Sequence, residues 1–155
     1  MAEFGESDAR MRERWRMALD VRGVTTLLQV YDMPTSVRFY RDVLGFEMVR
    51  HSPHRGGDPD RFHWCWLRLG GADLMLNGMY EFDEERPVPP DEARVAAHGD
   101  TGLFIGCPDV DAAYEELHAK GVDVKKPHVA PYGMKQMSLR DPDGYGLCFQ
   151  WEATT

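Results

Sequence analysis

The two halves of this chain repeat one order of predicted secondary structure. Each half has an expected strand, then a helix that begins at an aspartate and ends at a glycine, and then three further strands. The aspartates, Asp32 and Asp109, lie 77 residues apart, and the glycines, Gly45 and Gly121, lie 76 apart. Aspartate can accept hydrogen bonds from the free N–H groups of a helix start, and glycine can adopt the left-handed conformation that ends a helix. The repeat therefore predicts an α+β fold of two βαβββ modules.

The first module is expected at residues 23–78. Its strand, helix and three further strands are predicted in turn at residues 23–31, 32–45, 46–50, 62–69 and 72–77. Val37, Tyr40 and Leu44 give the predicted helix an apolar stripe. The glycine pair at 70–71 fits a two-residue hairpin turn between the last two strands. These patterns describe one complete βαβββ unit.

The second module is expected at residues 101–155. Its elements are predicted in the same order at residues 101–106, 109–121, 122–125, 133–139 and 146–151. Residues 79–100 are acidic, contain proline and have little periodicity, so we predict a linker there. Residues 1–22 are predicted to be an N-terminal helical extension, because Met11, Trp15 and Leu19 repeat at four-residue spacing over residues 8–19.

Composition limits the classes of function. The chain has 155 residues, a formal net charge of −8 and a sequence pI near 5.2. This acidic balance argues against a nucleic-acid partner, because neutralising phosphates needs clustered Lys and Arg. The N-terminus has no apolar run typical of a secretory signal, and no segment approaches the ~20 apolar residues of a membrane span. The three cysteines are an odd number without CxxC spacing, so no disulfide framework is expected. A soluble, cytoplasmic protein is predicted.

Three motifs resemble those of a known superfamily. The segments at residues 32–46 and 109–121 resemble the two helices of the vicinal oxygen chelate superfamily, and Asp141-Pro-Asp-Gly-Tyr145 resembles its closing turn. The superfamily includes glyoxalase I, extradiol dioxygenases and bleomycin-resistance proteins. The resemblance covers residues 23–152. It implies two βαβββ modules whose curled mixed sheets surround a cleft, commonly within a homodimer.

The resemblance also locates a metal site. Enzymes of the superfamily hold a divalent metal with one His, Gln or Glu side chain from each of four strands. The matching positions here are Thr25, Met75, Gly102 and Cys148. None is a good ligand for a hard divalent cation, and glycine has no side chain to offer. We therefore expect neither a metal nor another cofactor. A cluster of His51, His54 and His63 is an alternative metal site, but solvated loop histidines are the favoured interpretation.

Alternation along the strands predicts which side chains line the cleft. With Met75 on the cleft face, its neighbours on that face follow from the period of two and from the hairpin register. The predicted ligand-binding residues are Thr25, Gln29, Trp64, Trp66, Asp73, Met75, Asn77, Phe104, Cys148 and Gln150, with Leu27 and Arg68 on the same face. The opposite faces carry an apolar set suited to packing against helices: Leu28, Val30, Leu67, Leu74, Leu76, Leu147, Phe149 and Trp151.

The cleft composition indicates a class of ligand. Two indoles, a phenylalanine and several amides suit an aromatic or partly cationic organic molecule, although Trp64 and Trp66 could equally fill the concave side as core. We expect Arg68 and Asp73 to pair with each other and Cys148 to be an inert buried thiol. The favoured function is a small-molecule binding protein of the bleomycin-resistance type, acting as a homodimer. The alternative is a divergent glyoxalase-like or dioxygenase-like enzyme (a lyase, isomerase or oxidoreductase) with a relocated metal or a metal-free mechanism.

Overall fold

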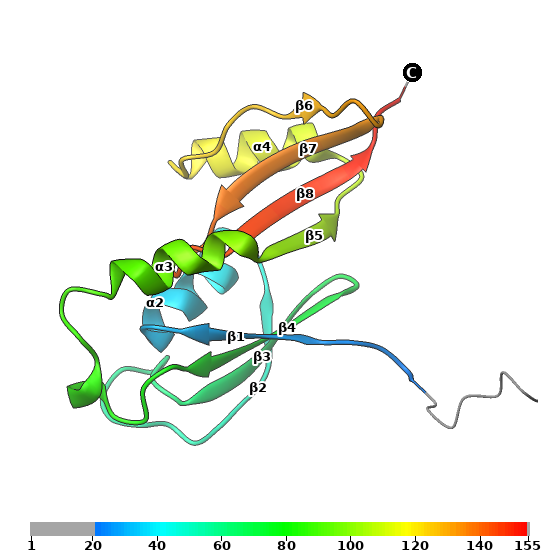
Figure 1. Ribbon diagram of the computed structural model, residues 1–155. Helices are drawn as coiled ribbons and strands as arrows, with labels where there is room; N and C mark the ends of the chain where they lie inside the picture. The colour runs from blue at the N-terminus through cyan, green and yellow to red at the C-terminus, as the bar shows by residue number, and fades with distance from the viewer. Residues whose placement is uncertain (1–20, 155) are drawn as a thin grey trace, which may run out of the picture.

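The computed structural model describes residues 21–154, which form two modules with the predicted order of elements (Figure 1). The first module consists of β1 (Thr26–Val30), α2 (Met33–Arg38), η1 (Phe39–Val43), β2 (Glu47–His51), β3 (Trp64–Leu69) and β4 (Ala72–Gly78). The second consists of β5 (Gly102–Gly106), α4 (Val110–Ala119), β6 (His128–Val129), β7 (Met134–Arg140) and β8 (Gly146–Glu152). The predicted α+β fold of two βαβββ modules is confirmed.

Each module forms one open, mixed sheet. The strand orders are β1-β4-β3-β2 and β5-β8-β7-β6, and neither sheet closes into a barrel. The strand that begins each module pairs in parallel with the strand that ends it, whereas the other pairs are antiparallel. Figure 1 shows the two sheets in opposite halves of the molecule, with α2 and α3 between them. The strands β1 and β5 are consequently edge strands.

The caps of the two main helices form as the repeat predicts. An Asp32 side-chain oxygen accepts a hydrogen bond from the Thr35 N–H at 3.2 Å, and Asp109 Oδ1 accepts one from the Ala112 N–H at 2.9 Å. Gly45 and Gly121, which follow these helices, have φ values of 87° and 77°. Only a residue without a Cβ takes such angles at little cost, so these glycines end the helices.

The first helix widens near its middle. The α-helical hydrogen bonds of α2 give way to π-type bonds in η1, where the Leu44 N–H donates to the Phe39 carbonyl at 3.1 Å. The sequence pattern predicts one continuous helix, because a single wider turn barely disturbs its apolar stripe. Val37 and Tyr40 are fully buried, as that stripe requires.

The hairpin of the first sheet has the register predicted from its glycine turn. Leu69 pairs with Ala72, Arg68 with Asp73, Trp66 with Met75 and Trp64 with Asn77. Side chains directly opposite each other in an antiparallel pair share one face. The predicted division of these residues between the two faces of the sheet therefore holds.

Two segments differ from the sequence predictions. The strand expected at residues 122–125 is wrong: Val124 is buried between exposed neighbours, but no strand lies beside it, and the pairing strand is β6 at His128–Val129. The linker at residues 79–100 contains the short helix α3 (Glu92–Ala97), flanked by the 3-10 turns η2 (Asp83–Glu85) and η3 (His98–Asp100). The helix predicted at residues 8–19 lies outside the described residues.

The inner faces of both sheets contribute to one hydrophobic core together with the helices. Seven of the eight residues predicted for these faces are buried there: Leu28, Val30, Leu67, Leu74, Leu76, Leu147 and Phe149. Trp151 is the exception: it lies near the end of β8, is 47% exposed and packs near Gly106. Since the inner faces share a core, the outer face of each sheet points away from it.

Candidate functional site

The outer face of the first sheet carries the two indoles. Trp64 and Trp66 project from β3 on the same side as Met75 and Asn77 of β4, and all four are half-buried. The Asn77 side-chain amide donates a hydrogen bond to Gln29 Oε1 on β1 at 3.1 Å. This surface therefore combines two flat aromatic groups with a fixed pair of amides.

Arg68 and Asp73 pair across the end of the hairpin. Two hydrogen bonds of 2.6 and 3.0 Å join them, and the guanidinium also lies 5.2 Å from the centre of the Trp66 ring. Arg68 thereby holds the pKa of the Asp73 carboxyl below its usual range. The buried indole N–H of Trp66 lies close enough to Asp73 to help lower the pKa of that carboxyl. It makes no hydrogen bond of regular geometry, however. The predicted pairing is confirmed, and the Asp73 charge is already engaged.

Two charged residues of this face were missed by the sequence analysis. Glu47 and Arg50 of β2 lie opposite Arg68 and Trp66 of β3, so they share the outer face with the indoles. They are three positions apart, which simple alternation would place on opposite faces. An irregularity in the register between Met48 and Arg50 brings both to the same side.

The outer face of the second sheet is smaller and more polar. Phe104 on β5 is 64% exposed and pairs with Cys148 on β8, which is buried. The side-chain amide of Gln136 on β7 donates at 2.8 Å to both Gln150 Oε1 and the Tyr132 hydroxyl. Gln136 was not among the predicted site residues, although the alternation used for the neighbouring strands would have placed it opposite Gln150.

Two hollows lie beside these faces. The junction hollow, of about 300 Å³, lies where the modules meet and is lined by Asp73 and Phe104 among others. The second-module hollow, of about 620 Å³, is lined in part by Phe104, Gly102 and Cys148. Of the predicted ligand-binding residues, Phe104 and Cys148 of the second module and Asp73 of the first therefore line these hollows, whereas Gln150 lines neither. Trp64 and Trp66 line neither hollow.

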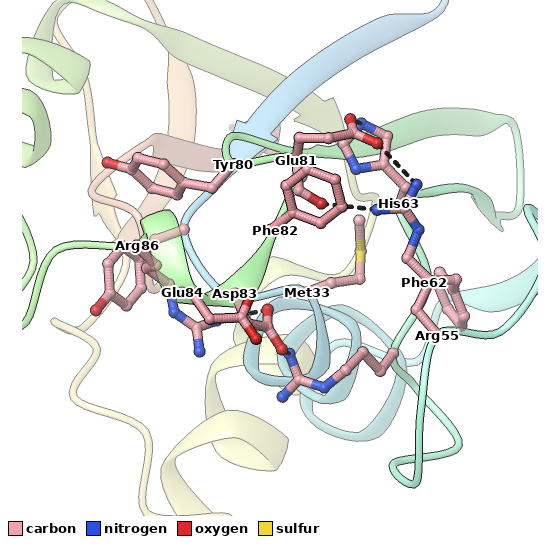
Figure 2. Close-up of a pocket in the computed structure, with 13 residues that line it drawn as sticks. Met33, Arg55, Phe62, His63, Tyr80, Glu81, Phe82, Asp83, Glu84 and Arg86 are labelled. Carbon is pink, nitrogen blue, oxygen red and sulfur yellow. Dashed lines mark hydrogen bonds and ion pairs between the residues drawn. The ribbon is translucent and has the colours of Figure 1, made fainter.

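A third hollow, of about 160 Å³, lies at one end of the first sheet (Figure 2). Aromatic and charged side chains line it, and Phe82 of the linker is 59% exposed beside it. Its arginines already have carboxylate partners: Arg55 pairs with Glu81 at 2.9 Å, and Arg61 with Asp83 at 2.5 Å. These pairs hold the linker against the loop between β2 and β3.

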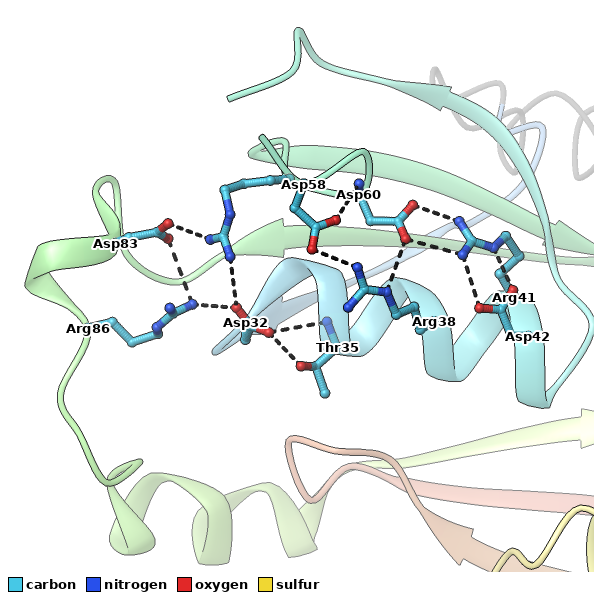
Figure 3. A network of polar contacts seen from close by, with 10 residues as sticks. Asp32, Thr35, Arg38, Arg41, Asp42, Asp58, Asp60, Asp83 and Arg86 are labelled. Carbon is cyan, nitrogen blue, oxygen red and sulfur yellow. Dashed lines mark hydrogen bonds and ion pairs between the residues drawn. The ribbon is translucent and has the colours of Figure 1, made fainter. Parts of the chain in front are cut away.

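A chain of ion pairs continues from this hollow along the first helix (Figure 3). Asp32 accepts hydrogen bonds from Thr35 and Arg86. Burial by itself would raise the pKa of the Asp32 carboxyl, but these bonds and the charge of Arg86 hold it below its usual value. Further along, Arg41 pairs with the nearly buried Asp60 at 2.7 Å. The chain fastens the loop after β2 and the linker to the helix. The predicted role of Asp32 as a helix cap is confirmed.

The two modules and their order agree with a known family. Residues 23–149 match the Glyoxalase/Bleomycin resistance protein/Dioxygenase superfamily. The chain belongs to this superfamily. No curated protein matches the chain.

Solved structures of the superfamily include antibiotic-binding proteins. The chain is 26% identical to TnmS3, an antibiotic binding protein from Streptomyces sp. CB03234, with a TM-score of 0.61 over 87% of this chain and 99% of that one. A bleomycin resistance determinant encoded on the transposon Tn5 has 19% identity and a TM-score of 0.61, over 86% and 100% of the chains. The bleomycin-binding protein of bleomycin-producing Streptomyces verticillus, solved with copper(II)-bleomycin, has 22% identity and a TM-score of 0.57, over 88% and 99%. The last two likenesses concern the fold alone.

The positions of the superfamily's metal ligands do not fit a divalent metal in this member. Thr25 and Met75 belong to the first module, and Gly102 and Cys148 to the second, so together they offer a hydroxyl, a thioether and a thiol. Hard divalent cations prefer carboxylate oxygen and imidazole nitrogen donors. Within residues 21–154, no three His, Cys, Asp or Glu side chains are grouped as metal ligands.

The candidate histidine cluster is also divided. The rings of His51 and His54 lie 4.6 Å apart between centres, and His51 stacks on Phe62 at 4.7 Å. His63 instead approaches Glu81, with 3.6 Å between its Nε2 and a carboxylate oxygen. Ring stacking and an ion pair therefore account for these three histidines. In the described part of the chain, no helix is both long and apolar enough to cross a membrane.

Proposed function

We propose that this protein sequesters an aromatic or cationic organic molecule, without changing it, in a cleft that holds no metal. The observation that carries the proposal is the pair of half-buried indoles, Trp64 and Trp66, beside Met75, where an enzyme of the superfamily would place a metal ligand. Aromatic side chains bind planar ligands by stacking, and a few fixed polar groups orient them. The hydrogen-bonded amides of Gln29 and Asn77 supply such groups.

Of the two ligand classes, the aromatic one has the greater support. A cationic ligand would need a free carboxylate or an open aromatic face. Asp73 is already bound by Arg68, and the guanidinium of Arg68 also lies against Trp66. Trp64 has no such cation against it, so its ring is the better platform for a planar ligand.

The cleft of this proposal forms between two copies of the chain. Within one chain the outer faces point away from the shared core, so each face provides half of a cleft. Leu27 on β1 and Phe104 on β5 are 43% and 64% exposed on the two edge strands, which supports contact with a second copy. The three cysteines are free, which fits a homodimer in the reducing cytoplasm.

Tryptophan fluorescence tests the binding role. A panel of planar aromatic and cationic antibiotics is titrated into the protein, and quenching by at least one compound is expected. The variants Trp64→Phe and Trp66→Phe should weaken that compound's binding several-fold, because phenylalanine offers a smaller stacking surface than tryptophan. Trp151→Phe is the matched control, because Trp151 lies on the opposite face of the other sheet. Unchanged binding in both cleft variants would contradict the proposal.

Metal analysis tests the absence of a metal. Protein purified without added metal is expected to contain less than stoichiometric Fe, Mn, Ni and Zn. Ligand affinity measured before and after treatment with a chelator should be the same. A stoichiometric metal whose removal abolishes binding or a catalytic activity would instead favour the enzymatic alternative.

A further inference from the structure

The second-module hollow has an apolar floor, made by Phe104 on β5 and Cys148 on β8. Leu139 and Leu147 also line it, although their side chains are buried in the shared core. Its volume of about 620 Å³ lies within the roughly 300–1,000 Å³ typical of small-molecule sites. The side of Phe104 is exposed there and is available for contact with an aromatic ring. The hollow can therefore receive the apolar body of a small ligand.

Two cations at the rim of this hollow have no carboxylate partner in the described part of the chain. Lys125, in the loop after α4, makes neither a hydrogen bond nor an ion pair within residues 21–154. Arg140, at the end of β7, donates only to the Gly144 carbonyl, at 2.8 Å. One carboxylate, Asp123, lines the same rim and is likewise unpaired within those residues. The rim therefore carries one net positive charge.

Most cations in the described part of the chain have a carboxylate partner, although Arg50 and Lys126, like Lys125 and Arg140, have none within residues 21–154. Acidic residues outnumber Lys and Arg by 26 to 18. Seven arginines of the described chain pair with carboxylates: Arg38, Arg41, Arg55, Arg61, Arg68, Arg86 and Arg94. Although carboxylates are in excess, Lys125 and Arg140 have no carboxylate partner beside this hollow within residues 21–154, so the Lys125 ammonium and the remaining N–H groups of Arg140 are available to a bound anion.

We infer that the bound molecule is an aromatic acid whose anionic group is held by Lys125 and Arg140 while its ring lies over the apolar floor beside Phe104. This inference rests on the proposed function and names the ligand class more closely. An ammonium and a guanidinium both donate charge-assisted hydrogen bonds to a carboxylate, and such bonds are roughly twice as strong as neutral ones. The Ser138 side chain, which also lines the hollow, supplies a neutral hydrogen-bonding group.

A pair of probes that differ only in charge tests the inference. Anthracene-2-carboxylate and anthracene-2-carboxamide have the same ring and nearly the same shape, and their dissociation constants are measured with the full-length protein by isothermal titration calorimetry. At low ionic strength the carboxylate should bind about tenfold more tightly than the amide. Raising the salt concentration should reduce this preference, because ions screen exposed charges.

Variants identify the source of the preference. Lys125→Gln and Arg140→Gln should each reduce it, and the double variant should bind the two probes within about twofold of each other. Lys126→Gln is the matched control, since it removes the same charge one residue away from the lining and should leave the preference unchanged. Circular dichroism and the melting temperature verify that each variant is folded.

The outcomes separate this inference from the proposed function. Equal binding of both probes by the unaltered protein would overturn the inference alone and leave ligand binding in place. A carboxylate preference that persists in the folded double variant would also overturn it. Failure of the protein to bind either aromatic probe would overturn the inference, and the proposed function would fall with it only if the antibiotic panel also gave no quenching.

Discussion

Arg94 Nη1 donates to Asp143 Oδ1 at 2.8 Å, and the two side chains are only 11% and 2% exposed. Arg94 belongs to α3 in the linker, and Asp143 to the turn between β7 and β8. The second guanidinium nitrogen donates to the Gln29 carbonyl of the first sheet at 2.7 Å. One side chain thus joins the linker to both modules, so the segment between the modules has a structural role beyond connecting them.

Replacing Arg94 by Met should lower the free energy of unfolding by about 3–5 kcal/mol, because it leaves the buried Asp143 carboxylate without its partner. Urea denaturation measures the change. Arg38→Met is the control: Arg38 is half-exposed in its pairs with Asp58 and Asp60, and Asp60 keeps Arg41 as a partner, so the loss should be clearly smaller. The double variant Arg94→Met/Asp143→Asn should recover part of the loss. Equal losses for Arg94→Met and Arg38→Met would contradict this account of the junction.

The glycine of the β7–β8 turn should tolerate no side chain. Gly144 has a φ of 87°, and a Cβ there would lie 2.7 Å from the Val95 carbonyl oxygen of α3. Gly133 has the same φ but no atom within 4 Å, so it is a matched control. Gly133→Ala should cost about 1–2 kcal/mol from backbone strain alone. Gly144→Ala should lower the free energy of unfolding by at least about 1 kcal/mol more than Gly133→Ala, as measured by urea denaturation. Equal losses would show that α3 can move away from the new side chain without a further loss of stability.

Asp141 should make the unfolding free energy depend on pH in an unusual direction. Burial raises the pKa of this carboxyl above its ordinary 3.8, despite hydrogen bonds from Tyr40 and the backbone. The folded state therefore keeps the proton to higher pH than the unfolded state. Its stabilising contribution is complete in acid and is lost as pH rises through the folded pKa. The free energy of unfolding relative to an Asp141→Asn variant should fall as the pH rises above about 3.8 and through the raised pKa of the folded state. A difference that stays constant or rises would contradict this assignment.

The dimer is tested by placing a charge on an edge strand. The unaltered protein should have the mass of two chains by light scattering. Phe104→Asp should shift that mass toward the mass of one chain, because the contact between the two copies would then have to bury a carboxylate. Val129→Asp is the control, since Val129 is similarly exposed but lies on β6 at the far edge of that sheet. A monomeric unaltered protein would rule out the two-chain cleft.

Much of the fold could be predicted from local patterns. The caps at Asp32 and Asp109 and the turn at Gly70 depend on bonds between residues close in sequence, so the chain order alone identifies them. The false strand at residues 122–125 shows the limit, because alternation at Val124 indicates burial but not a hydrogen-bonded neighbour. The helix α3 was missed because none of its residues is buried, although Asp91 caps it in the ordinary way.

The site was less predictable than the fold. Alternation correctly placed Trp64 and Trp66 with Met75, since period and register are properties of one hairpin. It missed Arg50, which reaches that face only through an irregularity in β2. The contributions of Lys125 and Arg140 were also missed, because a lack of partners is visible only when the whole surroundings of a charge are known.

The sequence by itself determined the two-module repeat, the hairpin register and the division of strand residues into two faces, because each follows from spacing along the chain. Only the tertiary structure decided that both inner faces share one core, that Arg94 and Asp143 join the modules, and that the outer faces of one chain point apart. These features depend on residues far apart in sequence, whose approach is set by packing and by the burial of paired charges rather than by any local pattern.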